Sequence, residues 1–415
     1  MDQPTAPLPP QHPSYASALA TPPPPRMPRH RGRRIGELTA VAVLTAALAS
    51  GGTWGVMALT DDGTTAVSST GAGTSGDSAA SVVPVSSASK TNPDWNAVTA
   101  AVTPSVVSIT VAAGSSGGEG SGVVLDKEGH ILTNHHVVSG AGDDATITVT
   151  LSDGKTYRAS IAGKDASTDL AVLTLEDPPD DLQPITVGSS SGLEVGDPVM
   201  AVGNPLGLSG TVTTGIVSAL DRPVTTSSTE SEQQDPFGQQ QQSSQVVTSA
   251  IQTSAAVNPG NSGGALVDAA GRLVGINSSI ASLGSSSGQS GSIGIGFAIP
   301  VDEAQWIAEQ LIEDGQAEHA FLGVTPSDGT AELGSATRSG AQIRSVSDGS
   351  PAAEAGLQEG DLVVGVDDST VTSAESLVGI IRSHRIGTKV SLAVVRDGEE
   401  QTIEATLGTA PTSQG

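Results

Sequence analysis

Residues 258–264 of this chain, Asn-Pro-Gly-Asn-Ser-Gly-Gly, hold Ser262 in a turn with a glycine two positions before it and two after it. Gly260 can take backbone angles that a residue with a Cβ avoids, so the N–H groups of residues 260 and 262 can converge on one point. Two converging donors suit a negative charge that develops on oxygen. Taken alone, however, a serine flanked by glycines most often marks a plain turn.

Two upstream segments carry the groups that would activate such a serine. Residues 131–138 read Ile-Leu-Thr-Asn-His-His-Val-Val, a strand that runs into a turn, and residues 167–173 read Ser-Thr-Asp-Leu-Ala-Val-Leu, where Asp169 opens an apolar strand. Hydrolysis of a peptide by a hydroxyl needs an adjacent base and a carboxylate that fixes the tautomer of that base. Each segment alone is a weak signal, but together they predict a nucleophilic serine site.

Short β-branched runs separated by turn residues dominate the chain from about Asp94 onward, for example at residues 105–111, 145–151 and 198–202. Aromatic residues make up 2% of the chain and glycine numbers 51, which predicts aliphatic cores with many turns. Many short strands with little helix between them favour antiparallel barrels or a sandwich. Polar loops are expected at residues 225–244 and 282–292.

One helix is expected to close this β region, with Asp302 as its N-cap and Gly315 as its end. A second domain is expected beyond Phe321, with strands near residues 341–346, 362–366 and 390–396 and a helix over residues 373–384. No internal repeat is visible.

Composition excludes several classes of protein. With 18 basic and 44 acidic residues the net charge is −26, which argues against a nucleic-acid partner, because such a partner needs a basic face. The absence of cysteine excludes disulfides, thiolate metal sites and a cysteine nucleophile. Histidine spacing suggests no metal site, and no motif calls for a cofactor.

The N-terminal part predicts a membrane anchor. Residues 1–37 hold five arginines and are rich in proline, which suggests a disordered cytoplasmic tail. Residues 38–59 carry no charge and are long enough to cross a bilayer as a helix. Residues 60–93 are rich in Gly, Ser, Ala and Thr and suggest a flexible stalk. The domains that follow would then lie outside the cytoplasm.

Two other interpretations of residues 38–59 stay open: a signal peptide cleaved near residues 47–49, and a buried helix. The long proline-rich leader and the long apolar run are atypical of signal peptides. Release of only a truncated band into the medium would favour cleavage.

Several motifs resemble the HtrA (high-temperature-requirement) family of serine proteases, over roughly 300 of the 415 residues. They lie at residues 120–124, 133–138, 167–173, 202–207, 214–220, 251–264 and 294–300. The resemblance implies a mainly β fold, with a chymotrypsin-like double β-barrel protease domain at residues 94–315 and a PDZ domain at residues 316–410. It also implies a homotrimer.

Position by position, the resemblance makes His136, the histidine followed by Val-Val, the general base. His135 is then only its neighbour. Asp169 would orient His136, Ser262 would attack the substrate, and the amides of Gly260 and Ser262 would form the oxyanion hole.

The resemblance also assigns the substrate-binding segment. Ile293, Gly294, Ile295, Gly296 and Phe297 would line the primary specificity pocket and pair with the substrate strand. Aliphatic residues and glycine without an acid imply a preference for small or medium apolar side chains.

In the second domain, Phe321, Leu322, Gly323 and Val324 resemble the carboxylate-binding loop of a PDZ domain. Free N–H groups there can hold a terminal carboxylate while the bound tail adds a strand to the sheet. The helix near residues 373–384 could form the other wall of the groove, or its apolar face could simply pack inward.

The chain is therefore expected to be a membrane-anchored, ATP-independent serine endopeptidase that cleaves misfolded or exposed extracytoplasmic polypeptides and recognises C-terminal tails. Two alternatives remain: a regulatory protease of one membrane signalling partner, and a catalytically silent PDZ chaperone or adaptor.

Overall fold

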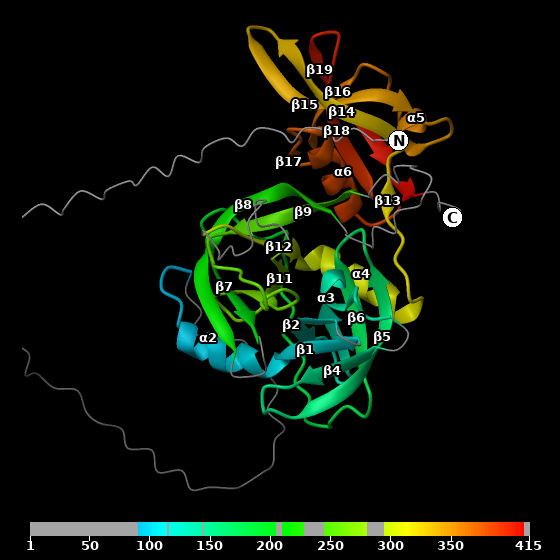
Figure 1. Cartoon of the computed structure of the whole chain (residues 1–415). Helices are drawn as coiled ribbons and strands as arrows, with labels where there is room; N and C mark the ends of the chain where they lie inside the picture. The colour runs from blue at the N-terminus through cyan, green and yellow to red at the C-terminus, as the bar shows by residue number, and fades with distance from the viewer. Residues whose placement is uncertain are drawn as a thin grey trace, which may run out of the picture. The chain divides into compact units, whose positions relative to one another are not determined.

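The computed structural model describes residues 90–113, 116–142, 145–204, 210–227, 245–279 and 294–410. These residues form two closed β-barrels, followed along the chain by a smaller β domain (Figure 1). The expectation of a mainly β, chymotrypsin-like double barrel plus a PDZ domain is confirmed.

The first barrel closes in the strand order β1-β2-β3-β6-β5-β4. Its strands are β1 (Val106–Ala113), β2 (Ser116–Val124), β3 (His130–Thr133), β4 (Thr146–Thr150), β5 (Thr156–Asp165) and β6 (Leu170–Leu175). Side chains of alternate residues fill the interior, among them Ile109, Ile131 and Leu173, each of which is fully buried.

The second barrel closes in the order β10-β11-β12-β9-β8-β7. Its strands are β7 (Pro198–Gly203), β8 (Thr211–Ser227), β9 (Gln245–Thr253), β10 (Ala265–Asp268), β11 (Leu273–Ser278) and β12 (Gly296–Pro300). A separate interior cluster includes Val199, Leu266 and Ala298. Another apolar core joins the two barrels through residues such as Leu170 and Met200.

A helix precedes the first barrel, where the sequence predicted only strands from Asp94 onward. It is α2 (Trp95–Val102), followed by the 3-10 turn η1 (Thr103–Ser105). The Asp94 side chain caps α2 by accepting from the Ala97 N–H at 3.1 Å. Val98 and Val102, four residues apart, both pack into the core between the barrels, which explains why this β-branched stretch is helical.

The predicted closing helix is α4 (Val301–Glu313), but its N-cap is Pro300 rather than Asp302. Asp302 lies in the first turn, and its carboxylate accepts the Ser191 N–H at 2.8 Å. Gly315 has φ 76°, which suits the glycine expected after the helix end.

The second domain contains two helices, α5 (Pro351–Ala355) and α6 (Ala374–Ser383), in its described residues. Its strands are β13 (Ala320–Phe321), β14 (Val324–Leu333), β15 (Ala336–Val346), β16 (Leu362–Val366), β17 (Ser369–Thr370), β18 (Lys389–Arg396), β19 (Glu399–Thr406) and β20 (Gly408–Thr409). β13 pairs with β20, and the other strands form one sheet. The domain has its own core, which includes Ile343, Leu377 and Leu392.

The N-terminal segments at residues 1–37 and 38–59, and all but the last few residues of the 60–93 segment, lie outside the described residues, so their predictions stay predictions. Within the described ranges, no helix combines the length and the apolar character that a membrane crossing requires. Most of the expected polar loop at residues 225–244 and the whole loop at residues 282–292 also lie outside the description, although residues 225–227 belong to β8.

Candidate functional site

The histidine and the aspartate of the predicted site come from neighbouring parts of the first barrel. β3 ends at Thr133, and the one-turn helix α3 (His135–Val138) carries His136. Asp169 stands just before β6 with φ 59°, a left-handed conformation that Asp tolerates better than most residues. This turn places the Asp169 carboxylate beside α3.

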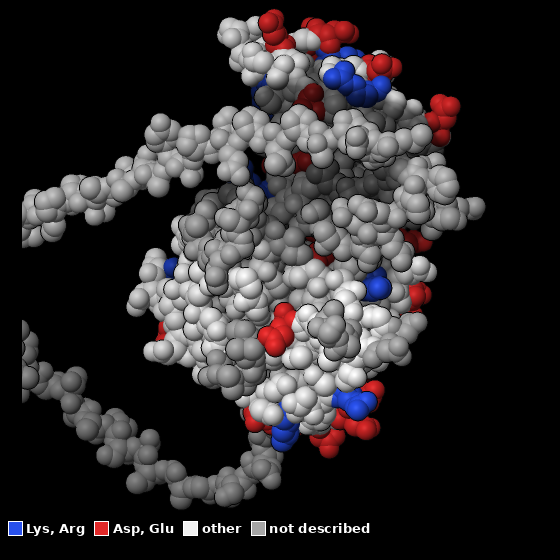
Figure 2. Space-filling model, viewed as in Figure 1, with Lys and Arg blue, Asp and Glu red and all other residues white. Residues whose placement is uncertain are grey.

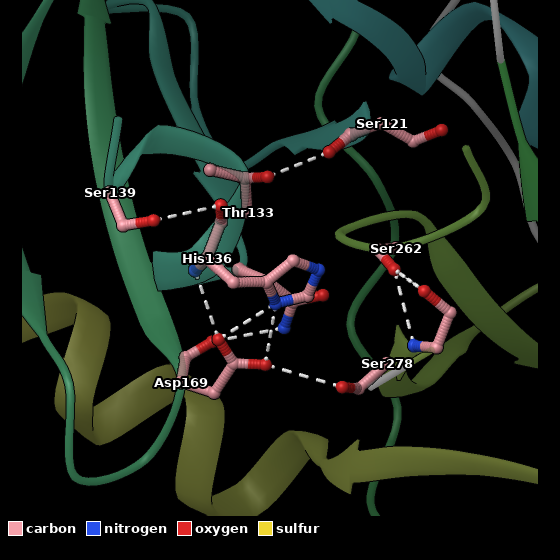
Figure 3. A network of polar contacts seen from close by, with 9 residues as sticks. Ser121, Thr133, His136, Ser139, Asp169, Ser262 and Ser278 are labelled. Carbon is pink, nitrogen blue, oxygen red and sulfur yellow. Dashed lines mark hydrogen bonds and ion pairs between the residues drawn. The ribbon is translucent and has the colours of Figure 1, made fainter. Parts of the chain in front are cut away.

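The Asp169 carboxylate is held by donors from two barrels (Figure 3). His136 Nδ1 lies 2.9 Å from Oδ1 and 3.0 Å from Oδ2, and the His136 backbone N–H donates to Oδ1 at 3.1 Å. Ser278 Oγ, at the end of β11, donates to Oδ2 at 3.2 Å. Because Nδ1 faces a carboxylate, the geometry favours the tautomer in which Nδ1 carries the proton and Nε2 is the free acceptor.

The turn around Ser262 has the conformation that its glycines predicted. Gly260 has φ 97° and Gly263 has φ 82°. A Cβ on Gly263 would lie 2.1 Å from the backbone oxygen of Ser121, so only glycine fits there. The Asn261 N–H donates to the Asn258 carbonyl at 2.9 Å. In the part of the chain that is described, no hydrogen bond uses the N–H of Gly260 or Ser262.

The Ser262 hydroxyl does not bond to His136 in this structure. Its oxygen lies 2.5 Å from Ser279 Oγ and accepts the Ser279 N–H at 3.1 Å. Figure 3 shows the His136 ring pointing from Asp169 toward Ser262, with the dashed lines from Ser262 running away from the ring. The structure thus brings His136, Asp169 and Ser262 together, with the serine hydroxyl bonded to a fourth residue, Ser279.

Sequence reasoning missed three serines that contact this constellation: Ser121, Ser278 and Ser279. Ser278 and Ser279 follow an apolar run, and nothing in their local pattern separates them from other turn serines. His135, expected to be only a neighbour of His136, is buried on α3.

The expected substrate-binding segment is only partly described, since Ile293 lies outside it. Gly294 is exposed, Ile295 is half-buried, and Gly296 pairs with Thr253 of β9. A Cβ on Gly296 would lie 2.8 Å from Val257 Cγ2, so this position packs against the segment before Ser262. Phe297, on the other face of β12, lines a small cavity that Asp169 also borders.

In the second domain, the predicted carboxylate loop borders a groove of about 180 Å³. Phe321, Leu322, Gly323 and Val324 form one side, and α6 forms the other with Leu377, Ile381 and Arg382. The carbonyls of Leu322 and Gly323 accept the N–H groups of Ala352 and Ser347 at 2.8 and 2.9 Å. Among the described residues, their own N–H groups donate no hydrogen bond, as a carboxylate site needs.

The α6 residues show whether this helix forms a wall of the groove or only packs inward. Leu377 and Ile381 both line the groove and belong to the domain core, whereas Ile380 is buried in the core alone. Arg382, which the sequence reasoning did not single out, brings a positive charge to the groove.

Uncharged surface covers most of the described face drawn in Figure 2, and acidic side chains stand out at its edges beside scattered basic ones. That face offers no continuous basic strip for a phosphate backbone in the described part of the chain.

Comparison with protein families gives two matches. Residues 120–276 match the trypsin-like peptidase domain, and residues 320–407 match the PDZ domain. The first match includes His136, Asp169 and Ser262, and the second includes the carboxylate loop.

Comparison with individual proteins also finds similarity to proteases. Over 397 residues the chain is 43% identical to the serine protease PepD of Mycobacterium tuberculosis, covering 94% of this chain and 81% of that protein. Over 307 residues it is 38% identical to the chloroplastic Protease Do-like 1 of Arabidopsis thaliana, covering 71% of this chain and 64% of that protein. Among solved structures, the HtrA-type protease AlgW with a tripeptide matches with a TM-score of 0.54 and 34% identity, over 78% of this chain and 99% of that one.

Proposed function

Since this chain belongs to the HtrA family of trypsin-like serine proteases with a PDZ domain, we propose that His136, Asp169 and Ser262 are its catalytic residues. The observation that carries the proposal is the His136 Nδ1–Asp169 Oδ1 contact of 2.9 Å beside the Ser262 turn. Asp169 would hold the imidazole with Nε2 free to accept a proton. Gly260 and Ser262 would supply the oxyanion donors.

The reaction follows from these positions. As Ser262 Oγ forms a bond to the substrate carbonyl carbon, its proton passes to His136 Nε2, and the carbonyl oxygen becomes an anion held by the N–H groups of residues 260 and 262. The C–N bond then breaks, and the leaving amine takes the proton from Nε2. Water then attacks the acyl carbon and gives one proton to Nε2, the bond between that carbon and Ser262 Oγ breaks, and Oγ takes the proton back from Nε2, which leaves the free serine and a carboxylic acid.

Ser262→Ala tests the catalytic assignment. The variant should lose peptide hydrolysis by about 10⁴-fold or more, keep peptide binding, and no longer react with a fluorophosphonate. Ser139→Ala is a matched control, because the Ser139 hydroxyl, at the end of α3, donates to the His136 carbonyl and not to the His136 ring. Wild-type turnover in Ser262→Ala would reject the assignment and leave the silent adaptor as the better interpretation.

Residues before Ser262 and in β12 support a preference for small or medium apolar side chains before the cleaved bond. Val257 is buried against Gly296, and neither residues 254–258 nor residues 294–298 contain a charged side chain. A peptide library should therefore show enrichment of apolar residues at that position. Enrichment of Arg or Lys would contradict this proposal.

The groove beside α6 supports recognition of C-terminal peptide tails. Its vacant N–H groups at Leu322 and Gly323 suit a carboxylate, and its apolar walls suit the last side chain of the tail. A peptide with a free carboxyl terminus should bind, and the same peptide with a terminal amide should bind at least tenfold more weakly. Equal binding of the two peptides would contradict the proposal.

The membrane anchor at residues 38–59, with a cytoplasmic N-terminus and extracytoplasmic domains, rests on the sequence alone. Immunoblots of membrane and medium fractions test it, because an anchored chain stays with the membrane at full length. A truncated chain found only in the medium would support a cleaved signal instead.

The chain's biological role would be ATP-independent protein quality control, carried out by a homotrimer on misfolded or exposed polypeptides. A regulatory protease is the second candidate, and the bond between Ser262 and Ser279 favours it, since an engaged nucleophile suits an enzyme that awaits a signal. Proteomics of membrane fractions with and without Ser262→Ala separates the two. Many stabilised unfolded proteins indicate quality control, and one stabilised membrane protein indicates regulation.

A further inference from the structure

We propose that Ser121, a residue of strand β2 that lies far from Ser262 in sequence, is a positioning residue that holds both oxyanion donors in place. This inference rests on the proposed function, because it concerns the same oxyanion hole. Ser121 comes from the first barrel, whereas the turn that it contacts belongs to the second. It is fully buried, so its hydroxyl has no water to replace a lost partner.

The Ser121 hydroxyl makes two hydrogen bonds whose directions are fixed by chemistry. Its oxygen lies 2.6 Å from the Gly260 carbonyl, which can only accept, so the single hydroxyl proton must point there. The same oxygen accepts the backbone N–H of Asn204, just beyond β7, at 2.9 Å. The hydroxyl therefore has one satisfied orientation and links the Ser262 turn to the end of β7.

The Ser121 backbone holds the other oxyanion residue. Its N–H donates to the Ser262 carbonyl at 2.8 Å, and its carbonyl accepts the Thr133 hydroxyl at 2.7 Å. Thr133 ends β3, three residues before His136. Figure 3 shows the bond between Ser121 and Thr133 on the side of the site away from Asp169.

Each proposed oxyanion residue is thus anchored through its own carbonyl to Ser121, Gly260 by the hydroxyl and Ser262 by the backbone N–H. With both carbonyls held, the peptide plane that follows each residue is fixed, which limits rotation of the residue and so restricts the direction of its N–H group. Neither N–H group has an acceptor among the described residues. Gly260 needs the anchor most, because a glycine at φ 97° has no side chain to resist rotation of its peptide groups. Without the hydroxyl, the half-buried Gly260 carbonyl and the Asn204 N–H both lose a partner.

Ser121→Ala tests this role. Only the hydroxyl is removed, so the Gly260 amide should lose alignment while the His136–Asp169 pair stays intact. We expect kcat to fall about ten- to hundredfold, somewhat less than the loss of a whole oxyanion donor, with KM within about twofold of the wild-type value. The inhibition constant of a peptide boronate, whose oxygen occupies the oxyanion hole, should rise by the same factor. The pH midpoint of kcat should not move, since the base is untouched.

Ser105→Ala is the matched control. Ser105 is also fully buried in the protease domain, but its hydroxyl has no partner among the described residues. Its removal should leave kcat and boronate inhibition within twofold of wild type. An equal loss in both variants, or an unchanged kcat and boronate constant in Ser121→Ala, would overturn the proposal.

A second pair of variants covers the case in which Ser121→Ala does not fold. Ser121→Thr keeps the hydroxyl, and Ser121→Val has the same shape without it, so the Thr variant should exceed the Val variant in kcat by about tenfold or more. Equal kcat values in this pair would also overturn the proposal. Failure of the catalytic assignment is recognised separately, by full activity in Ser262→Ala.

Discussion

A single hydroxyl decides whether this site is ready to react, because Ser262 has two possible hydrogen-bond partners, Ser279 after β11 and His136 on α3. In the structure its oxygen contacts Ser279 through both the hydroxyl and the amide of that residue. Meanwhile His136 is already held by Asp169. The base is therefore prepared, and the bond to Ser279 competes with transfer of the Ser262 proton to it.

Ser279→Ala should speed reaction at Ser262. A neutral hydrogen bond contributes about 0.5–1.5 kcal/mol, so the rate constant for fluorophosphonate labelling should rise about two- to tenfold when the competing hydroxyl is removed. Ser278→Ala is the natural comparison, because Ser278 donates to Asp169 instead and its removal should slow labelling. A labelling rate in Ser279→Ala at or below that of wild type would contradict this interpretation.

These residues also show which parts of the site can be predicted from the sequence. His136, Asp169 and Ser262 were predicted because each belongs to a local motif, and the structure brings the three together. Ser278 and Ser279 carry no local motif, and the motif at residues 120–124 that includes Ser121 gives no sign of what its hydroxyl binds. Their roles depend on contacts made only after both barrels close, such as the Ser121–Gly260 bond across 139 positions.

At the scale of a secondary-structure element, helix α4 carries a buried acid that forms no ion pair with any of the described residues. Glu303 is 3% exposed, and its Oε2 has no hydrogen-bond partner among the described residues. Burial, together with the smaller effect of the negative charge of Asp165, raises the pKa of Glu303 to about 8. The folded state therefore binds a proton that the unfolded chain releases at a lower pH.

Folding stability should consequently fall as pH rises from about 4.5 to about 8, because the raised pKa of Glu303 stabilises the folded state only while the carboxyl is protonated. Glu303→Gln should remove this loss, so its melting temperature should exceed that of wild type by several degrees at pH 9 and by little at pH 5. Calorimetry at both pH values measures the difference. Glu309→Gln, exposed on the same helix, should show no such change. If the difference in melting temperature between Glu303→Gln and wild type were the same at pH 5 and pH 9, the prediction would be contradicted.

The carboxylate loop depends on one glycine. Gly323 has φ 86°, and a Cβ there would lie 2.2 Å from the Cβ of Ser350. Gly323→Ala should therefore distort the loop and weaken binding of a tail peptide at least tenfold by calorimetric titration, while fluorophosphonate labelling of Ser262 continues. Gly334→Ala has similar backbone strain at φ 62° but no atom within 4 Å of the new methyl, so it should bind nearly normally. Equal binding by the two variants would show that the contact with Ser350 is irrelevant.

Elements differ in how well the sequence predicts them. Strands that follow alternating β-branched runs, such as β1, β16 and β18, were predicted, as was α6, which begins after its Ser373 cap, whereas β14 and β19 were not predicted. Helix α2 was not predicted, since its valines favour strands when read locally. Its helical form depends on the Asp94 cap and on packing of Val98 and Val102 into a core built by residues far along the chain. Asp302 was wrongly assigned as the N-cap of α4. Its actual partner, Ser191, lies 111 positions away in the sequence, so no local pattern could indicate that bond.

At the scale of the whole molecule, the barrels and the second domain have separate hydrophobic cores in the described residues. One core joins both barrels and α4, through residues such as Leu132, Ile276 and Leu311. The proposed active site lies where the barrels meet, since His136 and Asp169 belong to the first barrel and Ser262 to the second. The second domain has a separate core made only of residues between Ala320 and Leu407. Such separate cores are typical of domains that fold independently.

Residues 320–410 should therefore fold as an isolated fragment, with a cooperative thermal transition by circular dichroism and tail-peptide affinity close to that of the whole chain. Strands β13 and β20 pair Ala320 with Thr409 and Phe321 with Gly408, directly beside the carboxylate loop. A fragment that ends at residue 407 keeps every residue of the core but loses this pairing, so it should melt earlier and bind the tail more weakly because the loop loses its support. If the longer fragment melts without cooperativity, the second domain depends on the barrels for its fold, and tail recognition belongs to the whole molecule.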